Sequence, residues 1–267
     1  MRLFVGTSGW QYDDWRGGLY PAGVAKKRWL ERYAECFATT ELNASFYYPV
    51  GRKTFEGWRQ RTPEGFVMAV KAGRTLTHRT RLKEPREAVE AMVEAARGLG
   101  DRLGPFLVQL PPTMRAEPER LDATLRAFPK DVRVAVEPRH QTWWTDEVRG
   151  VLERHNAALC WADREDAPVA PLWRTADWGY LRFHEGTAEP WPMYGEDVLD
   201  AWLERLGEPR GDDWYVYFNN DPGGAAVRNA VQFAEKARKA GWDATRTPAE
   251  FPESLLQPAS REWNTPD

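Results

Sequence analysis

The chain has 267 residues, a formal net charge of −3, 42% hydrophobic residues and 29% charged residues. This length suits one α/β barrel, and the apolar content can supply a sizeable core, which excludes disorder of the chain as a whole. The weakly negative net charge excludes a positive field over the whole molecule, so we do not expect non-specific nucleic-acid binding as the main activity. A local basic patch is still compatible with this net charge.

Short β-rich runs alternate with longer amphipathic runs along the chain, which predicts a parallel sheet covered by helices. Eight strands are expected, at Leu3–Ser8, Thr40–Phe46, Phe66–Ala72, Phe106–Leu110, Val132–Glu137, Ala158–Asp163, Gly179–His184 and Trp214–Asn219. Apolar residues that recur every three or four positions predict helices between them. These are Ala25–Phe37, Arg86–Leu99, Glu117–Phe128, Asp146–His155, Glu196–Leu206 and Ala225–Ala240, with a weaker signal at Gly51–Arg61.

Eight such units fit a closed (β/α)8 TIM-type barrel, which we expect as a single α/β domain over residues 1–243. The alternative is an open doubly wound sheet, but that fold would place a Gly-rich nucleotide turn after its first strand. Residues 244–267 contain four prolines and few apolar side chains. We therefore expect a Pro-rich C-terminal tail that extends over the surface.

Several features bear on the compartment. We find no apolar run of about 18 residues, so no membrane span is expected. The first residues lack a signal-peptide pattern. Cys36 and Cys160 lie far apart within apolar segments. Buried thiols in a reducing environment fit this pattern better than a disulfide, which favours a cytoplasmic protein.

Strand alternation predicts which side chains face the barrel axis. In the strand at Gly179–His184, the inner face carries Tyr180, Arg182 and His184. The other strands also place polar groups at their carboxyl ends, where barrel enzymes carry their chemistry. These groups are Glu41, Asn43, Lys71, Gln109, Glu137, Asp163 and Asn219.

Charges of both signs at this end must be paired or hydrogen-bonded, because an isolated buried ion costs several kcal/mol. One interpretation is a salt-bridge network that only fixes strand register. The other is a functional pocket, which the sequence favours because apolar side chains would fill a barrel more stably.

Individual residues suggest roles within such a pocket. Glu137 could be a general acid, a general base or a metal ligand, and an ion pair with Lys71 or Arg182 is equally compatible with its position. Lys71 could act as a base or a Schiff-base nucleophile, but anion binding is the favoured role.

The chain has four histidines. His155 falls late in a helix and suits the surface, and His140 suits the surface or the rim, which leaves His78 and His184 as site candidates. With Asp163 and Glu137 they could hold a single divalent metal, although no HxH or HExxH spacing supports one. No Walker or Rossmann motif is present, so no nucleotide cofactor is expected.

The segment Phe218–Ala225 carries the most specific local signal. Asp221 and Pro222 predict a helix start with Asp as the N-cap, and Gly223 and Gly224 then expose backbone N–H groups directly after the last strand. Barrels commonly bind phosphate there. An ordinary capped helix is the alternative. The residues expected to hold a phosphate here are Asn219, Asn220, Gly223 and Gly224.

Seven motifs occur together in chain order: Gly6-Thr7-Ser8-Gly9-Trp10, Glu41-Leu42-Asn43-Ala44-Ser45-Phe46-Tyr47, Lys71-Ala72 with Thr77-His78, Gln109-Leu110-Pro111-Pro112, Val136-Glu137-Pro138-Arg139-His140, Arg182-Phe183-His184 and Phe218-Asn219-Asn220-Asp221. Over roughly residues 2–242 the chain resembles the YecE-like family, the seventy-second of the families termed domains of unknown function. The resemblance implies a TIM-type barrel and no established activity. The family's distant similarity to endonuclease-IV-like and sugar-isomerase-like barrels points to nucleic-acid or sugar-phosphate chemistry.

The chain departs from that pattern in two ways. Four histidines are too few for the metal cluster of those distant relatives, which argues against a metal-dependent nuclease. Glu185 stands where a glycine is expected after His184, so we expect an altered rim.

Three functions follow as hypotheses. The first is an enzyme, a hydrolase or an isomerase, that acts on a phosphate- or sugar-containing small molecule. Glu137 would be its acid/base, Lys71, Arg182 and the 219–224 turn would hold the anion, and His184 or Asp163 would be the second proton-transfer or orienting group. The other ligand-binding residues expected are Ser8, Trp10, Asn43, Tyr47, His78, Gln109, Arg139 and Trp143.

The second hypothesis is a nucleic-acid-processing barrel, with Trp10, Tyr47, Trp143 and Trp144 as stacking groups beside a basic rim. The third is a non-catalytic binding protein, for which a fully salt-bridged interior would be the sign.

Overall fold

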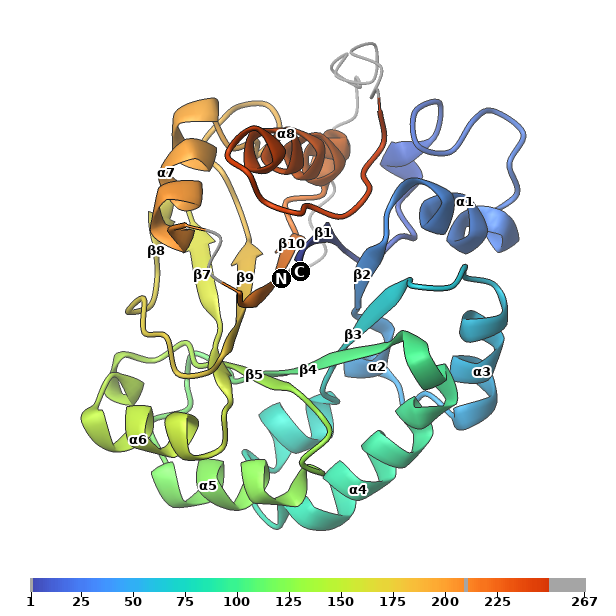
Figure 1. Ribbon diagram of the computed structural model, residues 1–267. Coiled ribbons are helices and arrows are strands. Elements are labelled where there is room, and N and C mark those ends of the chain that lie inside the picture. The colour runs from blue at the N-terminus through green and yellow to red at the C-terminus, as the bar shows by residue number, and fades with distance from the viewer. Residues whose placement is uncertain (1, 209–210, 250–267) are drawn as a thin grey trace.

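A computed structural model describes residues 2–208 and 211–249. Its ten strands form one curled sheet in the order β6-β5-β4-β3-β2-β1-β10-β9-β7-β8, with the helices on the outer side (Figure 1). The strands are β1 (Leu3–Ser8), β2 (Thr39–Leu42), β3 (Val67–Lys71), β4 (Leu103–Gln109), β5 (Val134–Glu137), β6 (Ala158–Leu159), β7 (Trp161–Arg164), β8 (Ala167–Pro168), β9 (Trp178–Phe183) and β10 (Asp213–Phe218).

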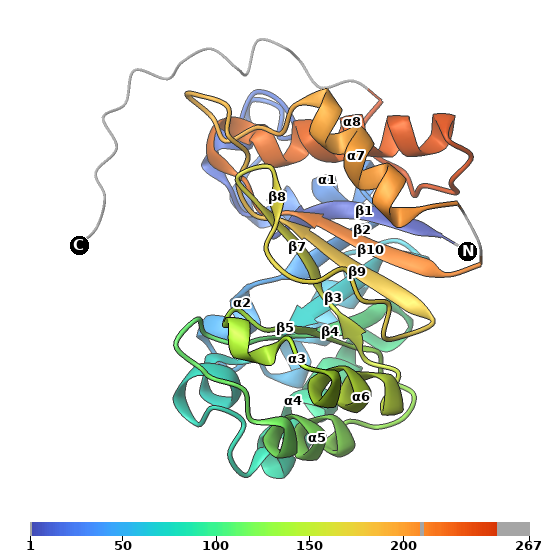
Figure 2. The same cartoon turned by 90° about the vertical axis from the view of Figure 1, so that its left-hand side faces the viewer.

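The protein is therefore a mixed α/β single domain built on a strongly curled sheet, seen from the side in Figure 2. The expected strand at Ala158–Asp163 is divided into β6 and β7. β6 pairs with β5, and β7 pairs with β9 and with the short antiparallel strand β8. Between them, the backbone N–H of Cys160 still donates to the carbonyl of Val136 at 2.8 Å. The ladder is interrupted because the chain changes its neighbour at this residue.

The helices follow the strands along the outer side of the sheet. They are α1 (Trp29–Cys36), α2 (Ala44–Tyr47), α3 (Arg52–Gln60), α4 (Pro85–Ala96), α5 (Pro118–Ala127), α6 (Asp146–Arg154), α7 (Glu196–Leu206) and α8 (Ala225–Lys239). Short helical turns lie at Asp13–Trp15, Lys26–Arg28, Arg97–Arg102, Gln141–Trp143 and Pro222–Gly224, and a π-helical turn η3 lies at Thr75–Arg79.

The prediction of a strand over Thr40–Phe46 was wrong in its second half. β2 ends at Leu42, and Asn43 has the right-handed helical conformation that starts α2. The Asn43 side-chain amide also donates to the Ser8 hydroxyl at 3.0 Å. This contact draws the chain toward β1 and away from the direction of the strand.

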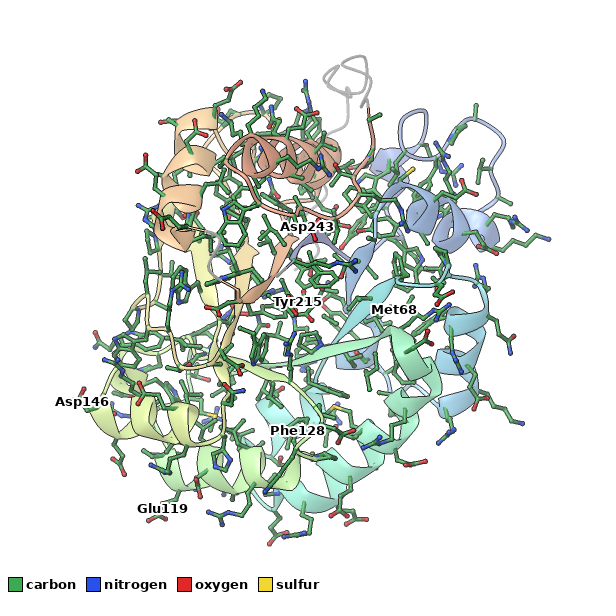
Figure 3. All side chains as sticks on the ribbon, in the orientation of Figure 1. Met68, Glu119, Phe128, Asp146, Tyr215 and Asp243 are labelled. Carbon is green, nitrogen blue, oxygen red and sulfur yellow. The ribbon has the colours of Figure 1, made fainter. Side chains whose placement is uncertain are left out.

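Two apolar layers hold the fold together. The larger one fills the space between sheet and helices and includes Met68 and Phe128, whereas the smaller one lies inside the curl and includes Tyr215. Figure 3 shows Tyr215 near the centre of the molecule, with Glu119 and Asp146 pointing outward from their helices. The alternation predicted for the strands accounts for this division, since successive side chains point to opposite faces.

The beginning of the predicted tail is anchored to the sheet. The backbone N–H of Leu3 donates to the carbonyl of Asp243 and the carbonyl of Leu3 accepts from Thr245, each at 2.9 Å. The Arg246 guanidinium donates to the carbonyl of Ala34 at 2.7 Å. The rest of the predicted tail, residues 250–267, lies outside the described residues. Within the described chain, no helix is long and apolar enough to cross a bilayer.

Candidate functional site

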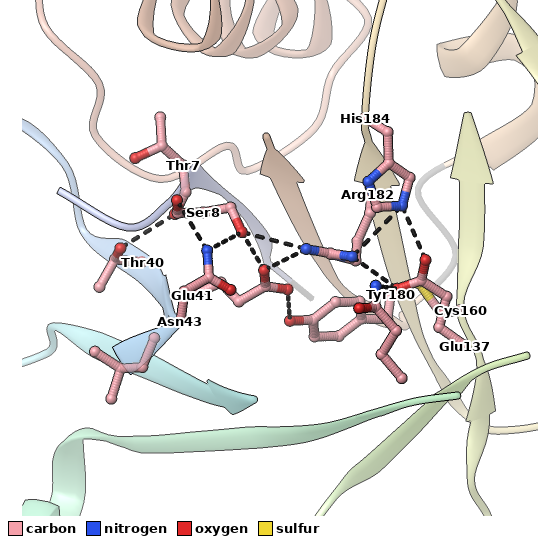
Figure 4. Close-up of polar contacts among 12 residues, drawn as sticks. Thr7, Ser8, Thr40, Glu41, Asn43, Glu137, Cys160, Tyr180, Arg182 and His184 are labelled. Atoms are coloured by element: carbon pink, nitrogen blue, oxygen red, sulfur yellow. Dashed lines mark hydrogen bonds and ion pairs between the residues drawn. The ribbon is translucent and has the colours of Figure 1, made fainter. Parts of the chain in front are cut away.

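Arg182 is the centre of a polar cluster at the carboxyl ends of the strands. It lies on β9, is 1% exposed, and spans the inside of the curl between two buried glutamates (Figure 4). One guanidinium nitrogen is 2.8 Å from Glu41 Oε1 on β2, and another is 2.7 Å from Glu137 Oε2 on β5. Three strands far apart in sequence are thus joined by one buried chain of charges.

Glu137 accepts hydrogen bonds on both carboxylate oxygens. Besides Arg182, its Oε2 accepts from Gln109 Nε2 at 2.8 Å. Its Oε1 accepts from Arg139 Nη2 at 3.1 Å and is 2.9 Å from His184 Nε2. Strand alternation placed all of these side chains except Arg139 at the same end of the sheet, and the structure brings them into direct contact.

Glu41 forms the opposite end of the cluster. Its Oε2 accepts from the Tyr180 hydroxyl at 2.6 Å, and its Oε1 accepts a short hydrogen bond from Ser8. Asn43 Nδ2 donates to Ser8 Oγ at 3.0 Å. Tyr180 was expected on the inner face but was not among the predicted site residues. Its two-residue spacing from Arg182 is the signal that identifies it.

The surroundings fix the charge states of these groups. Burial opposes ionisation of Glu137, but Arg182, His184 and Arg139 outweigh it and hold the pKa of its carboxyl well below the usual range. Burial and the Arg182 charge have the same opposing effects on Glu41, whose pKa is also lowered. For His184, burial outweighs the attraction of Glu137 and lowers the imidazole pKa. The cluster therefore holds two carboxylates and a neutral histidine at neutral pH.

A pocket of about 340 Å³ opens beside His184. Since Glu137 is ionised and can only accept, His184 Nε2 must donate to it, which leaves Nδ1 of the neutral ring with a free lone pair. Nδ1 has no hydrogen-bond partner among the described residues. The pocket is lined by Pro112, Glu137, Pro138, Arg139, Ala162, Arg164, Val169 and His184.

Lys71 ends β3 at the same mouth of the sheet. It is 9% exposed, its Nζ lies 4.4 Å from the centroid of the Phe46 ring, and no acidic side chain of the described chain forms an ion pair with it. Burial, followed by the repulsion of Arg182, lowers the pKa of its ammonium to about 8. An unpaired cation of this kind can hold an anion and can also release a proton near neutral pH.

Asp163 does not belong to this cluster, contrary to prediction. It is fully buried on the outer face of β7, where its Oδ2 accepts from Trp202 Nε1 of α7 at 2.6 Å. Cys160 and Ala162 occupy the inner face of this strand. Strand alternation therefore directs Asp163 toward the helices and away from Glu137.

Two predicted stacking groups are also interior residues. Trp143 is fully buried, and its Nε1 donates to the carbonyl of Met114 at 2.8 Å. Trp10 is 6% exposed and packs edge-on against Trp58 of α3. Their large apolar surfaces are used for packing between sheet and helices, so neither offers a face to a ligand.

The turn after β10 differs from the expected phosphate site. The backbone N–H of Gly223 donates to the Asp14 carboxylate at 3.0 Å, and the Trp191 ring lies where a Cβ of Gly223 would be. The N–H of Gly224 donates to the carbonyl of Asp221. The donors expected to bind a phosphate are thus taken by the protein itself. Asp221 also makes no side-chain capping hydrogen bond.

Of the two asparagines of this turn, Asn220 has its side-chain amide engaged inside the protein. Asn220 is buried, and its Nδ2 donates to the carbonyl of Pro192 and to Asn229 Oδ1, each at 2.9 Å. Asn219 is half-buried, and its backbone N–H continues the ladder to Phe183 at 2.8 Å.

His78 and Tyr47 lie next to the cluster. His78 is in the π-helical turn η3, and its ring packs edge-on against Phe46 with centroids 5.0 Å apart. Burial and the nearby Lys71 charge lower the pKa of this imidazole. Tyr47 is 64% exposed and, together with Phe46, lines a second pocket.

The residues expected for a single divalent metal are not assembled. Asp163 is on the outer face, and His184 and Glu137 are hydrogen-bonded to each other. Among residues 2–208 and 211–249, no group of three His, Cys, Asp or Glu side chains is placed to hold a metal ion. Arg164, which the sequence analysis did not identify, lines the pocket, because it follows the outward Asp163 and emerges at the rim.

Comparison with known proteins agrees with this architecture. The chain is 27% identical over 268 residues to the UPF0759 protein YunF of Bacillus subtilis. The alignment covers 87% of this chain and 94% of YunF. The crystal structure of a DUF72 family protein from Thermotoga maritima has a TM-score of 0.77 and 28% identity, covering 89% of this chain and all of that one.

A more distant solved structure, SacUVDE, has a TM-score of 0.53 at 10% identity and covers 90% of this chain and 99% of that one. At this identity the similarity concerns the fold alone. The resemblance inferred from the ordered motifs is confirmed by a family model that matches residues 4–253. Because this match spans nearly the whole chain, the protein belongs to the family described as "Protein of unknown function DUF72".

Proposed function

We propose that this protein is an enzyme that binds a small molecule carrying a phosphate or similar anionic group, and that it transfers a proton at the carboxyl ends of the strands. One observation carries the proposal: His184 Nε2 lies 2.9 Å from Glu137 Oε1 beside a pocket lined by Arg139, which also contacts Glu137, and by Arg164, which pairs with Glu185 at 2.7 Å. A neutral histidine oriented by a carboxylate, next to cations, is an arrangement suited to general base catalysis on an anionic substrate.

The roles differ from those expected from sequence. Glu137 accepts four hydrogen-bond donors and stays ionised, so it orients His184 and stabilises the imidazolium that forms when Nδ1 takes a proton. His184 is then the base. Lys71, with its pKa of about 8, supplies a second proton donor at the same mouth.

Charge complementarity supports an anionic ligand. Glu41 and Glu137 provide two negative charges, whereas Arg182, Arg139 and protonated Lys71 provide three positive ones. The excess cation is buried without an acidic partner in the described chain, which is costly unless a ligand or solvent anion compensates for it. A phosphate or carboxylate on the substrate would complete the balance.

We also infer that the curled sheet is a closed barrel. β6 and β7 are separated by Cys160 alone, and together they contact β5 on one side and β9 on the other. Counted as one strand, and with the hairpin strand β8 set aside, they give the eight strands of a (β/α)8 barrel. The similarity in fold to SacUVDE supports this description.

The experiment has a binding arm and a chemical arm. Calorimetric titration with inorganic phosphate and with a panel of aldose and ketose phosphates should show binding that weakens about tenfold in Arg139→Gln. Proton NMR in deuterated solvent would then follow exchange of carbon-bound hydrogen, and colorimetry would follow phosphate release. His184→Gln should lose turnover and keep binding.

His155→Gln is the matched control, because His155 lies at the end of α6 beside Asp122 and away from the mouth. Full turnover in His184→Gln would remove His184 from the mechanism. Absence of binding by inorganic phosphate and every sugar phosphate would overturn the proposal of an anionic small-molecule substrate.

A further inference from the structure

A second pocket is lined in part by Phe46, the residue whose ring lies 4.4 Å from Lys71 Nζ. Its volume is about 380 Å³, and it is a groove between the α2–α3 connection and α4. Apolar groups, among them Phe55, Leu76 and Met92, form its floor. We refer to it as the Tyr48 groove, lined by Ser45, Phe46, Tyr47, Tyr48, Pro49, Val50, Phe55, Gly73, Arg74, Thr75, Leu76, Arg79, Ala88, Ala91, Met92 and Ala95.

Two neighbouring tyrosines are exposed at the groove. Tyr47 is 64% exposed and Tyr48 is 75% exposed, and they are the exposed large aromatic side chains of the described chain. Every tryptophan of the described chain is at least half-buried, although the sequence holds 14 of them. Aromatic side chains left in solvent at the edge of an apolar groove provide flat faces on which a planar ligand can stack.

Unpaired arginines border the same groove. Arg74 and Arg79 are exposed and line it, and neither forms an ion pair with any described residue. Arg81, just beyond them, is also exposed and, within the described chain, contacts only the Thr113 hydroxyl, at 3.3 Å, whereas Arg52 at the start of α3 is paired with Glu56 at 3.1 Å. The groove therefore carries a local positive charge from Arg74 and Arg79, although the net charge of the chain is weakly negative.

The segment that carries these arginines has unusual backbone geometry. Thr75–Arg79 is a π-helical turn, and Arg81, Leu82 and Glu84 just beyond it have φ values of 51°, 61° and 45°. π-turns and positive φ values at non-glycine residues are costly and are found disproportionately at functional sites. This geometry presents Arg74 and Arg79 to the groove while Leu82 stays fully buried.

We propose that the Tyr48 groove binds single-stranded nucleic acid, with bases stacked on Tyr47 and Tyr48 and phosphates held by Arg74 and Arg79. Stacking faces beside a strip of cations are how proteins recognise single strands without reading their sequence. Two successive aromatic groups and two cations in an open groove suit a polymer better than one nucleotide. This site is separate from the proposed function, because it uses none of Glu137, His184 or Arg139.

The test is fluorescence anisotropy of the whole chain with a labelled single-stranded oligonucleotide of mixed sequence, about 12 nucleotides long. Tyr48→Ala should weaken binding about tenfold without changing its salt dependence, and Tyr48→Trp should restore it. Arg74→Gln and Arg79→Gln should each lower the slope of log affinity against log salt by about 0.7. Arg126→Gln, an exposed arginine on α5 paired with Asp122, is the charge-matched control.

Several results would overturn the proposal. These are absence of binding at low salt, equal binding of duplex DNA of the same length, or equal competition by a mononucleotide or by polyglutamate. A Tyr48-dependent self-association in sedimentation velocity would instead assign the groove to a second copy of the chain. Phosphate titration of the charged mouth should be unchanged in all four groove variants, so that failure here is distinguishable from failure of the proposed enzyme function.

Discussion

Replacing Arg182 tests the physical basis of the charged cluster. Arg182→Met removes a cation that is 1% exposed and leaves Glu41 and Glu137 buried without it. Removing one partner of a buried ion pair costs about 3–5 kcal/mol, because the remaining charge is desolvated and uncompensated. We expect the free energy of unfolding to fall by about 4 kcal/mol at neutral pH.

The loss should depend on pH in a defined direction. In the wild type both glutamate pKa values are lowered, so both carboxylates stay ionised on mild acidification and their contribution to stability is lost only as the pH falls through the lowered values. In Arg182→Met, burial raises the pKa of these carboxyls, so the folded state takes up protons that the unfolded state does not. Each such proton makes the variant more stable by about 1.4 kcal/mol per pH unit of acidification.

Urea unfolding at about pH 7 and about pH 5 measures this difference, and the variant should recover about 2–3 kcal/mol relative to the wild type. Arg149→Met is the control, because its ion pair with Glu153 is about half exposed and should contribute less than about 1 kcal/mol at either pH. An Arg182→Met loss that is equal at both pH values would refute the argument that unpaired carboxylates cause it.

Two further predictions concern buried titratable groups. Lys71→Met should stabilise the protein by about 2 kcal/mol at neutral pH, because burial lowers the Lys71 pKa to about 8 and the folded state holds a desolvated cation below that pH. In chemical denaturation, the free energy of unfolding of the wild type should therefore rise between about pH 8 and 10, and this rise should be absent from the variant. Asp163→Asn should also stabilise the protein, by about 2 kcal/mol above pH 6, because burial raises the Asp163 pKa to about 6 and the wild type loses stability as the pH rises through that value. If the variant keeps the wild-type pH dependence of stability between about pH 4 and 6, another group is responsible for it.

The positions of the main site residues could be predicted because they depend on local rules. Strand alternation puts Arg182 and His184 on one face, and parallel strands bring Gln109 and Glu137 to the same end. These residues are indeed in contact. Which atoms meet could not be predicted, because strand register and the orientation of a guanidinium group are set by the packed structure.

The errors have physical causes as well. Trp10 and Trp143 were expected among the ligand-binding and stacking residues, yet both are buried, because the large apolar area of a tryptophan favours packing in the interior. Gly223 has a positive φ of 67°, but Asp14, more than two hundred residues away in sequence, accepts the hydrogen bond from its backbone N–H. A partner so remote in sequence leaves no local signal.

The break at Cys160 could not be anticipated either. The segment Ala158–Asp163 is a continuous β-rich run, and nothing in its composition indicates where it exchanges one neighbour for another. The same run shows why Asp163 was misplaced. Small side chains at Cys160 and Ala162 suit the crowded interior of the curl, and their alternation directs Asp163 outward.

Phe46 contacts both the charged end of the sheet and the Tyr48 groove. Its ring contacts Lys71 and His78, and it also lines the Tyr48 groove. A displacement of this side chain would therefore change both the surroundings of Lys71 and the shape of the Tyr48 groove. If a ligand in the Tyr48 groove shifts the ring and thereby changes the affinity of the charged site for its own ligand, that second ligand must change the affinity of the groove by the same factor.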